Sequence, residues 1–129
     1  MSKQAIQTSN APAAIGPYSQ AIRAGDTIYV SGQLPIDPGT GKFAGEDIAS
    51  QTKQSLENIR GVLTAADANM TDIVKTTVFL KDMSEFSAMN KVYEEYFTET
   101  CPARAAVQVA KLPKDARVEI EAIAVVRHS

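Results

Sequence analysis

Cysteine and histidine are almost absent from this sequence: its 129 residues include one of each, and no tryptophan. Because a single cysteine, Cys101, cannot form a disulfide within the chain, the composition fits a reducing compartment such as the cytoplasm. Even together, Cys101 and His128 cannot supply the ligands of a typical zinc site from one chain. We therefore expect no metal, and any chemistry has to use carboxylates, arginine, hydroxyl groups, backbone groups and water.

Long apolar runs and an excess of positive charge are also missing. No stretch approaches the roughly 20 apolar residues of a membrane-spanning helix, and the N-terminal "MSKQAIQTSNAP" has no hydrophobic signal region. The net charge is -2 at pH 7, which gives no basic surface for nucleic acid. These absences predict a cytoplasmic protein that binds neither membranes nor nucleic acids.

Length and composition indicate one ordinary globular domain. With 44% hydrophobic and 22% charged residues, a chain of this length can bury a hydrophobic core. No internal repeat, linker or low-complexity segment divides the sequence. Residues 1–129 are therefore predicted to form a single domain.

Hydrophobic periodicity predicts the order of the secondary-structure elements. Leu56, Ile59 and Leu63 recur at helical spacing, whereas the β-branched run "IVKTTVFLK" alternates as a strand does. The expected elements are a short strand near 3–8, a hairpin over 20–33, a surface loop over 34–47, a helix over 47–67, a strand over 73–81, a helix over 82–97 and two final strands within 104–126.

Both expected helices are amphipathic on one side only, which suits an α+β fold with the helices on one face of a mixed sheet. Asp82 and Glu85 have the spacing of a capping box at the start of the second helix. Several strands carry apolar side chains on both faces, as Ile120 and Ile123 do in the last strand. This pattern predicts an oligomer that covers the second face of the sheet.

One arginine and two glutamates stand in the last two strands, which we predict to form a hairpin-like pair around "KLPKD". Arg104 has two interpretations: an ion pair at a strand edge, or a clamp that binds a ligand carboxylate through two charge-assisted hydrogen bonds. Glu119 and Glu121 lie on one strand face and are either solvated or held near the sheet interior. In the second case Arg104 is the expected partner, and one carboxylate is left for chemistry.

Further candidate residues lie in turns, at a strand end and on a helix. Tyr18 follows a Gly-Pro turn, and Asn90 lies on the second helix. Ser31 and Gly32 end a strand, where glycine indicates a bulge or a backbone N–H offered to a ligand. Each of these also has an ordinary interpretation in packing or exposure, and we interpret Cys101, in a loop before proline, as incidental.

Six segments carry a family resemblance: "NAPAAIGPYSQA", "SGQLPIDPGTG", "QTKQSLENI", "IVKTTVFLKDM", "MNKVYEEYF" and "PARAAVQVAKLPKDARVEIEAIAV". Together they resemble the RidA/YjgF family of reactive-intermediate deaminases over nearly the whole chain. The resemblance implies a chorismate-mutase-like fold, with a mixed sheet and two helices on one face. It also implies a homotrimer whose sheets form a central barrel, with three clefts between adjacent subunits.

The same resemblance implies a reaction that needs no cofactor: hydrolysis of 2-imino acids, such as 2-iminobutanoate and 2-iminopropanoate, to 2-keto acids and ammonia. The imines arise from enamines that pyridoxal-phosphate enzymes release. By this resemblance Arg104 binds the substrate carboxylate, Glu119 orients and deprotonates the attacking water, and Glu121 is structural.

The resemblance further implies that Tyr18, Ser31, the backbone of Gly32 and Asn90 line the cleft. One position departs from the family pattern, because relatives usually have a cysteine two residues after the arginine, where this chain has Ala106. The family role there is largely a backbone carbonyl that holds the water, which alanine retains. The change therefore bears on thiol-based regulation and fine substrate preference, not on the reaction.

Two other functions stay open from the sequence. A non-catalytic regulator would bind keto acids in the same cleft, but it would need only Arg104, so the presence of Glu119 favours an enzyme. An endoribonuclease or translation inhibitor, an activity of some relatives, is disfavoured by the acidic charge balance and the absence of a Lys/Arg stripe.

Overall fold

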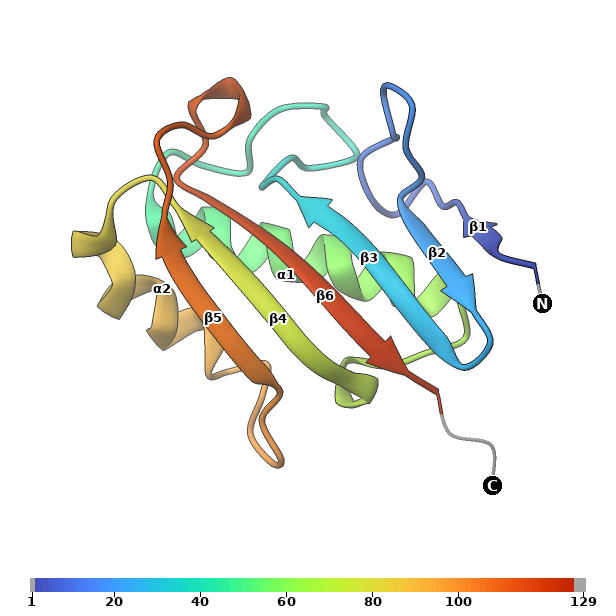
Figure 1. Ribbon diagram of the computed structural model, residues 1–129. Coiled ribbons are helices and arrows are strands. Elements are labelled where there is room, and N and C mark those ends of the chain that lie inside the picture. Colours follow the sequence, from blue (N-terminus) through green and yellow to red (C-terminus); the bar gives the residue numbers. More distant parts are fainter. Residues whose placement is uncertain (1, 127–129) are drawn as a thin grey trace.

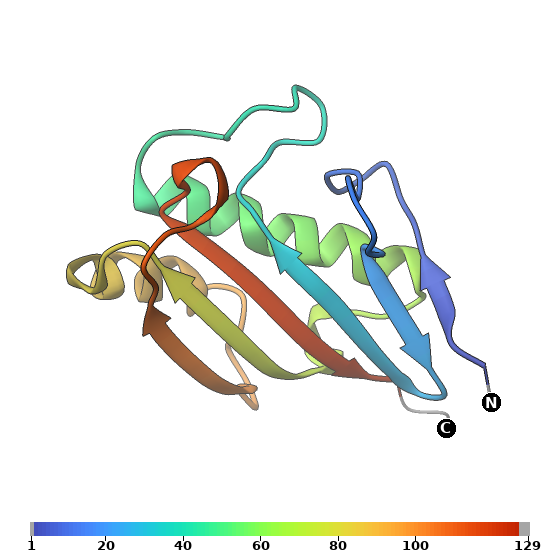
Figure 2. The same cartoon turned by 45° about the horizontal axis from the view of Figure 1, so that its top comes forward.

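The computed structural model describes residues 2–126, so His128 lies outside the described residues. A six-stranded sheet forms one layer, and both helices lie on the same face of it (Figures 1 and 2). The predicted α+β fold with two helices on one face of a mixed sheet is therefore confirmed. No helix among residues 2–126 is long and apolar enough to cross a membrane.

The strands follow the order β1-β2-β3-β6-β4-β5 across the sheet. All neighbouring pairs are antiparallel except β4 and β5, which run parallel. The elements are β1 (Gln4–Ile6), β2 (Ala21–Ala24), β3 (Thr27–Gln33), α1 (Ile48–Ala65), β4 (Ile73–Leu80), α2 (Phe86–Tyr93), β5 (Ala103–Gln108) and β6 (Val118–Val125).

The N-terminal hairpin formed by β2 and β3 is confirmed. The turn between these strands contains Gly25, whose φ of 63° suits glycine because it has no Cβ. The short strand β1 adds to the outer edge of β2. The loop that follows β3 is irregular, as predicted, apart from an isolated bridge between Ile36 and Phe43.

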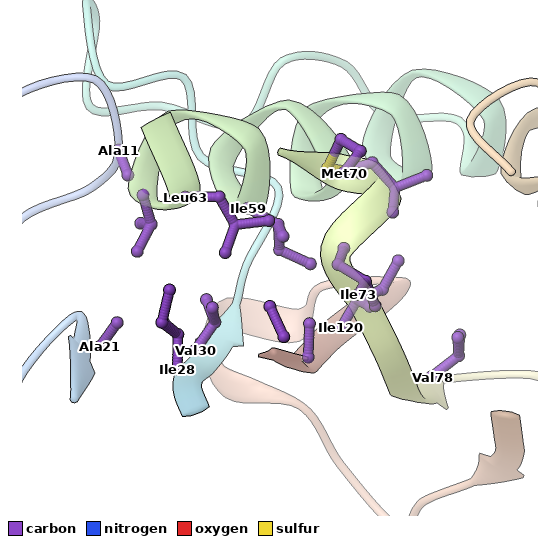
Figure 3. Packing of buried hydrophobic residues seen from close by; sticks show 14 of the residues in the cluster. Ala11, Ala21, Ile28, Val30, Ile59, Leu63, Met70, Ile73, Val78 and Ile120 are labelled. Carbon is purple, nitrogen blue, oxygen red and sulfur yellow. The ribbon is translucent and has the colours of Figure 1, made fainter. Parts of the chain in front are cut away.

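Helix α1 covers the centre of the sheet and supplies much of the core. The Asp47 carboxylate caps its first turn by accepting a hydrogen bond from the backbone N–H of Ser50 at 2.9 Å. Ile59 and Leu63 point from α1 toward Ile28 of β3 (Figure 3) and, like Ile28, are completely buried. Burial of each such side chain stabilises the fold by about 1.5–3 kcal/mol.

Helix α2 is shorter than the predicted 82–97 because a 3-10 turn, Met83–Glu85, precedes it. Asp82 caps this turn, but the predicted capping box with Glu85 is wrong. The Glu85 carboxylate instead pairs with Arg117 Nη1 at 3.1 Å. The predicted apolar stripe packs as expected, with Met89, Tyr93 and Phe97 buried and Phe86 partly buried.

The last two strands do not form the predicted hairpin. Strand β4 lies between them, antiparallel to β6 and parallel to β5, so β5 is an edge strand (Figure 1). A turn rich in Pro and Asp between two strands favours a hairpin locally. Here the longer β4, which is rich in apolar and β-branched residues, takes the place beside β6 instead.

The face of the sheet that points away from the helices carries large apolar side chains. Tyr29 is 50% exposed and Val107 is 43% exposed, and Phe79, Ile123 and Val125 are partly exposed on the same face. In β6 these positions alternate with side chains that are buried against the helices. An apolar face of this kind is typical of a surface that contacts another molecule.

Candidate active site

A β-bulge interrupts β3 at Ser31 and Gly32. From Val30 to Gln33 the strand advances three residues, whereas the paired residues of β6 lie only two apart. The bulge that glycine indicated at this position is therefore confirmed. A bulge bends its strand and redirects nearby side chains, and bulges are frequent beside active sites.

The carboxylate of Glu119 lies directly against this bulge. A Cβ added to Gly32 would come within 2.5 Å of Glu119 Oε2, so glycine leaves the space that the carboxylate occupies. Burial raises the pKa of Glu119, and the neighbouring charge of Glu121 raises it further. No group among residues 2–126 donates a hydrogen bond to Glu119 or pairs with it. Glu119 is thus a half-buried carboxylate with a raised pKa and no partner among the described residues.

Ser31 connects the bulge to the loop that carries Tyr18. Its hydroxyl donates to the carbonyl oxygen of Ser19 at 2.6 Å, and its backbone N–H donates to that of Gln20 at 3.0 Å. Tyr18 is 54% exposed and lines a cavity of about 260 Å³ between this loop and β1. Tyr18, Ser31, Gly32 and Glu119 therefore belong to one connected region of the chain.

Gln20, which the sequence analysis missed, holds the same loop in place. Its amide is buried and accepts a hydrogen bond from the backbone N–H of Thr8 at 2.7 Å. The amide nitrogen donates to the carbonyl oxygens of Thr8 and Pro12, at 3.0 and 2.8 Å, and to that of Ala11 at 3.3 Å. The sequence shows only a glutamine between a Gly-Pro turn and a strand, and its burial, which makes it an anchor, is visible in the structure alone.

Arg104 lies near the start of the edge strand β5 and points toward α2. Its Nη1 donates to Asn90 Oδ1 at 2.6 Å, and its guanidinium carbon lies 4.7 Å from the ring centre of Tyr93 and 5.3 Å from that of Phe86. Ala106, two residues along β5, packs partly against the core. Arg104 is exposed and forms no ion pair among residues 2–126. Its remaining N–H groups are therefore available to an anion.

Arg104 and Glu119 do not meet within one chain, so the predicted pairing of the arginine with the glutamates is wrong. Arg104 contacts α2 on the helix face, whereas Glu119 alternates with buried residues and lies on the opposite face. Along β4, Arg104 is paired with Thr76 and Glu119 with Phe79. Three residues of strand correspond to about 10 Å. The insertion of β4 between β5 and β6 causes this separation.

Neither Cys101 nor a metal site adds chemistry to the surroundings of Glu119 and Arg104 in the described part of the chain. Cys101 is exposed in the loop before β5, and its thiol lies 3.4 Å from the carbonyl oxygen of Phe97. Within residues 2–126 no group of three or more His, Cys, Asp or Glu side chains is arranged to hold a metal ion.

Comparison with known proteins identifies the class to which this fold and these residues belong. The family described as Endoribonuclease L-PSP matches residues 8–126. The chain belongs to this family, also known as RidA/YjgF, so the resemblance noted in the sequence is confirmed.

Close relatives and solved structures extend over nearly the whole chain. A 2-iminobutanoate/2-iminopropanoate deaminase of Salmonella typhimurium is 55% identical over 125 residues, which is 95% of this chain and 97% of the relative. A protein of the same name from Capra hircus is 54% identical over 95% of this chain and 90% of its own length. The crystal structure of the YjgF gene product of Escherichia coli superposes with a TM-score of 0.93 at 51% identity, covering 96% of this chain and 99% of that one.

Proposed function

We propose that this chain hydrolyses 2-imino acids, such as 2-iminobutanoate and 2-iminopropanoate, to 2-keto acids and ammonia. The names of the relatives from Salmonella typhimurium and Capra hircus support this reaction. The observation on the chain itself that carries the proposal is the carboxylate of Glu119. It is half-buried against the Gly32 bulge, has a raised pKa and has no partner in the part of the chain that the structure describes, as a general base requires.

We further propose that the site is completed by a second copy of the chain in a homotrimer. Arg104 and Asn90 of one copy then face Tyr18, Ser31, Gly32 and Glu119 of the next copy. Two observations support this assembly. Within one chain Arg104 and Glu119 lie on opposite faces of the sheet, and the face that carries Glu119 has exposed apolar side chains for a partner to cover.

In this site the substrate carboxylate binds Arg104 through two parallel hydrogen bonds, which fixes the imine carbon beside Glu119. Glu119 takes a proton from water while the water oxygen attacks the imine carbon. The proton then passes to the nitrogen of the resulting carbinolamine. With the imine protonated at the start, this nitrogen is now an ammonium, so the C–N bond breaks and ammonia leaves. The remaining hydroxyl gives its proton to the Glu119 carboxylate and becomes the carbonyl of the keto acid. The carbonyl oxygen of Ala106, on the same strand as Arg104, is the further acceptor for the water.

Two other functions fit the site less well. A regulator that only binds keto acids has no need of a desolvated carboxylate beside the ligand, because that charge opposes binding of an anion. Cleavage of RNA calls for phosphate contacts, and the net charge of -2 provides no excess of lysine and arginine for them.

A coupled assay tests the proposed reaction. A threonine dehydratase generates 2-iminobutanoate in the presence of a reagent that traps the imine, and release of 2-ketobutyrate is followed in time. We expect this chain to accelerate release and to reduce the amount of trapped imine. Unchanged release over a wide range of protein concentrations would contradict the proposed function.

Substitution of Gly32 by alanine is expected to lower kcat for imine hydrolysis by roughly tenfold or more, because the new methyl group displaces the Glu119 carboxylate. The matched control is Gly39→Ala, where the added Cβ meets only the side chain of Asp37, at 3.3 Å. Steady-state kinetics of both variants, with thermal unfolding to check the fold, measure the effect. Wild-type kcat in a folded Gly32→Ala protein would mean that the position of Glu119 against the bulge does not matter.

A further inference from the structure

Three side chains of α2 converge on the guanidinium group of Arg104. Phe86, Asn90 and Tyr93 are spaced four and three residues apart, so they lie along one side of the helix. Both rings lie within the range of cation–π contacts, and Asn90 takes one hydrogen of Nη1. The sequence pattern assigns Phe86 and Tyr93 only to the apolar stripe of α2 that packs on the core. In the structure they also contact a charged group.

A buried hydrogen bond fixes the ring of Tyr93. Thr76 Oγ1 and Tyr93 Oη are 2.7 Å apart, and the two residues are 1% and 6% exposed. Thr76 is also the residue of β4 that is paired with Arg104 in the parallel ladder. These contacts connect β4, α2 and β5: Thr76 of β4 is paired with Arg104 of β5 and is hydrogen-bonded to Tyr93 of α2. Tyr93 in turn contacts the guanidinium group of Arg104.

This hydrogen bond specifies an orientation that apolar packing alone would not. Phenylalanine in place of Tyr93 and valine in place of Thr76 would fill nearly the same volume, and no hydroxyl group would have to be desolvated. Replacing both partners of such a hydrogen bond is often nearly neutral for stability. What the Thr76–Tyr93 bond adds is a defined position for the ring against which Arg104 rests.

We propose that Phe86, Tyr93 and Thr76 are positioning residues that hold the guanidinium plane of Arg104 with its Nε–Nη2 edge free for a ligand carboxylate. Asn90 occupies Nη1, while Nε and Nη2 donate to no group among residues 2–126. An arginine ordered in advance loses less side-chain freedom when it binds, which improves affinity. The identity of the ligand, a 2-imino or 2-keto acid, rests on the proposed function.

The first test compares Phe86→Leu with the matched control Tyr96→Leu. Tyr96 contacts a different guanidinium group, that of Arg60, at 5.2 Å, so the control removes the same type of contact elsewhere, together with the hydrogen bond that Tyr96 Oη donates to Glu57 at 2.6 Å. In Phe86→Leu we expect both the KM for the imine and the Kd for 2-ketobutyrate to rise roughly three- to tenfold, with kcat nearly unchanged. In Tyr96→Leu both should stay at the wild-type values. If both variants lose only stability, and Phe86→Leu keeps the wild-type KM and Kd, Phe86 is a packing residue and the proposal is wrong.

The second test replaces Tyr93 by phenylalanine and Thr76 by valine in one protein, which keeps the packing but removes the hydrogen bond. NMR of the Arg104 side chain reports rotation of its guanidinium group directly, with or without ligand. We expect restricted rotation in the wild type and faster rotation in this double variant and in Phe86→Leu.

The NMR result separates this inference from the proposed function. Restricted rotation in the wild type that is lost in the variants supports the positioning role even if no imine is hydrolysed, because no substrate is needed. Free rotation of the Arg104 guanidinium group in the wild type would overturn the inference, whatever the activity.

Discussion

Replacement of Glu119 by glutamine is expected to lower kcat for imine hydrolysis by about 10²–10⁴-fold, the usual effect of losing a general base. Glutamine keeps the shape of the side chain beside Gly32 but cannot take a proton from water. Binding of 2-ketobutyrate, which depends mainly on Arg104, should stay close to that of the wild type. Single-turnover kinetics measure the chemical step, and calorimetry measures the binding.

The matched control is Glu121→Gln, because Glu121 is an exposed carboxylate on the same strand face. We expect this variant to change stability more than turnover. If Glu121→Gln lost activity while Glu119→Gln kept it, the base would be Glu121. If both variants turned over imine at the wild-type rate, water would be activated by another group.

The raised pKa of Glu119 sets the direction of two further effects. A base must be ionised, so activity should fall as the pH decreases through this raised pKa, at a higher pH than for an ordinary glutamate. Because the pKa is higher in the folded than in the unfolded chain, ionised Glu119 opposes folding at neutral pH. Thermal unfolding of Glu119→Gln at pH 7 should therefore occur at the wild-type temperature or above it.

Replacement of Arg104 by alanine is expected to reduce kcat/KM by about a hundredfold or more, or roughly 3 kcal/mol of binding to the substrate carboxylate. The same variant should bind 2-ketobutyrate much more weakly in calorimetry. Arg104→Lys should recover only part of this affinity, because an ammonium group cannot form two parallel hydrogen bonds and stacks less well on Phe86 and Tyr93.

Arg60→Ala is the control for the loss of a stacked arginine, since Arg60 contacts Tyr96 away from the candidate site. Its affinity for 2-ketobutyrate should match that of the wild type. Unaltered affinity in a folded Arg104→Ala protein would show that the ligand carboxylate binds elsewhere.

Local patterns in the sequence predicted the parts of the fold that depend on neighbouring residues. The helical spacing of Leu56, Ile59 and Leu63 predicted α1, and the alternation in "IVKTTVFLK" predicted the strand β4. Gly32 marked the bulge because glycine in a strand interior needs a local reason. These features depend on the backbone and on one amphipathic face, and both are visible within a few residues.

The pairing of distant segments was not visible in this way. The two final strands looked like a hairpin, but β4 separates them, and with them Arg104 from Glu119. The capping box failed for a similar reason, because Glu85 pairs with Arg117, which is 32 residues away. The support of Arg104 by Phe86 and Tyr93 was also missed, since it depends on how α2 packs against β5.

Mixing of two inactive variants tests most directly whether the site is built from two copies of the chain. Arg104→Ala and Glu119→Gln are co-expressed in equal amounts with different tags, which show that mixed trimers form. The random mixture of trimers is then assayed. In a trimer that contains both variants, one site of the three combines an intact Arg104 with an intact Glu119. As about three quarters of randomly formed trimers are mixed, about one quarter of wild-type activity should return.

The control mixes Arg104→Ala with a chain that carries both substitutions, which cannot form an intact site in any arrangement. We predict no recovery in this control and recovery to about one quarter in the test mixture, with both assemblies at the trimer mass by sedimentation equilibrium. Co-assembly of Arg104→Ala and Glu119→Gln without any return of activity would contradict a site shared between Arg104 of one chain and Glu119 of the next.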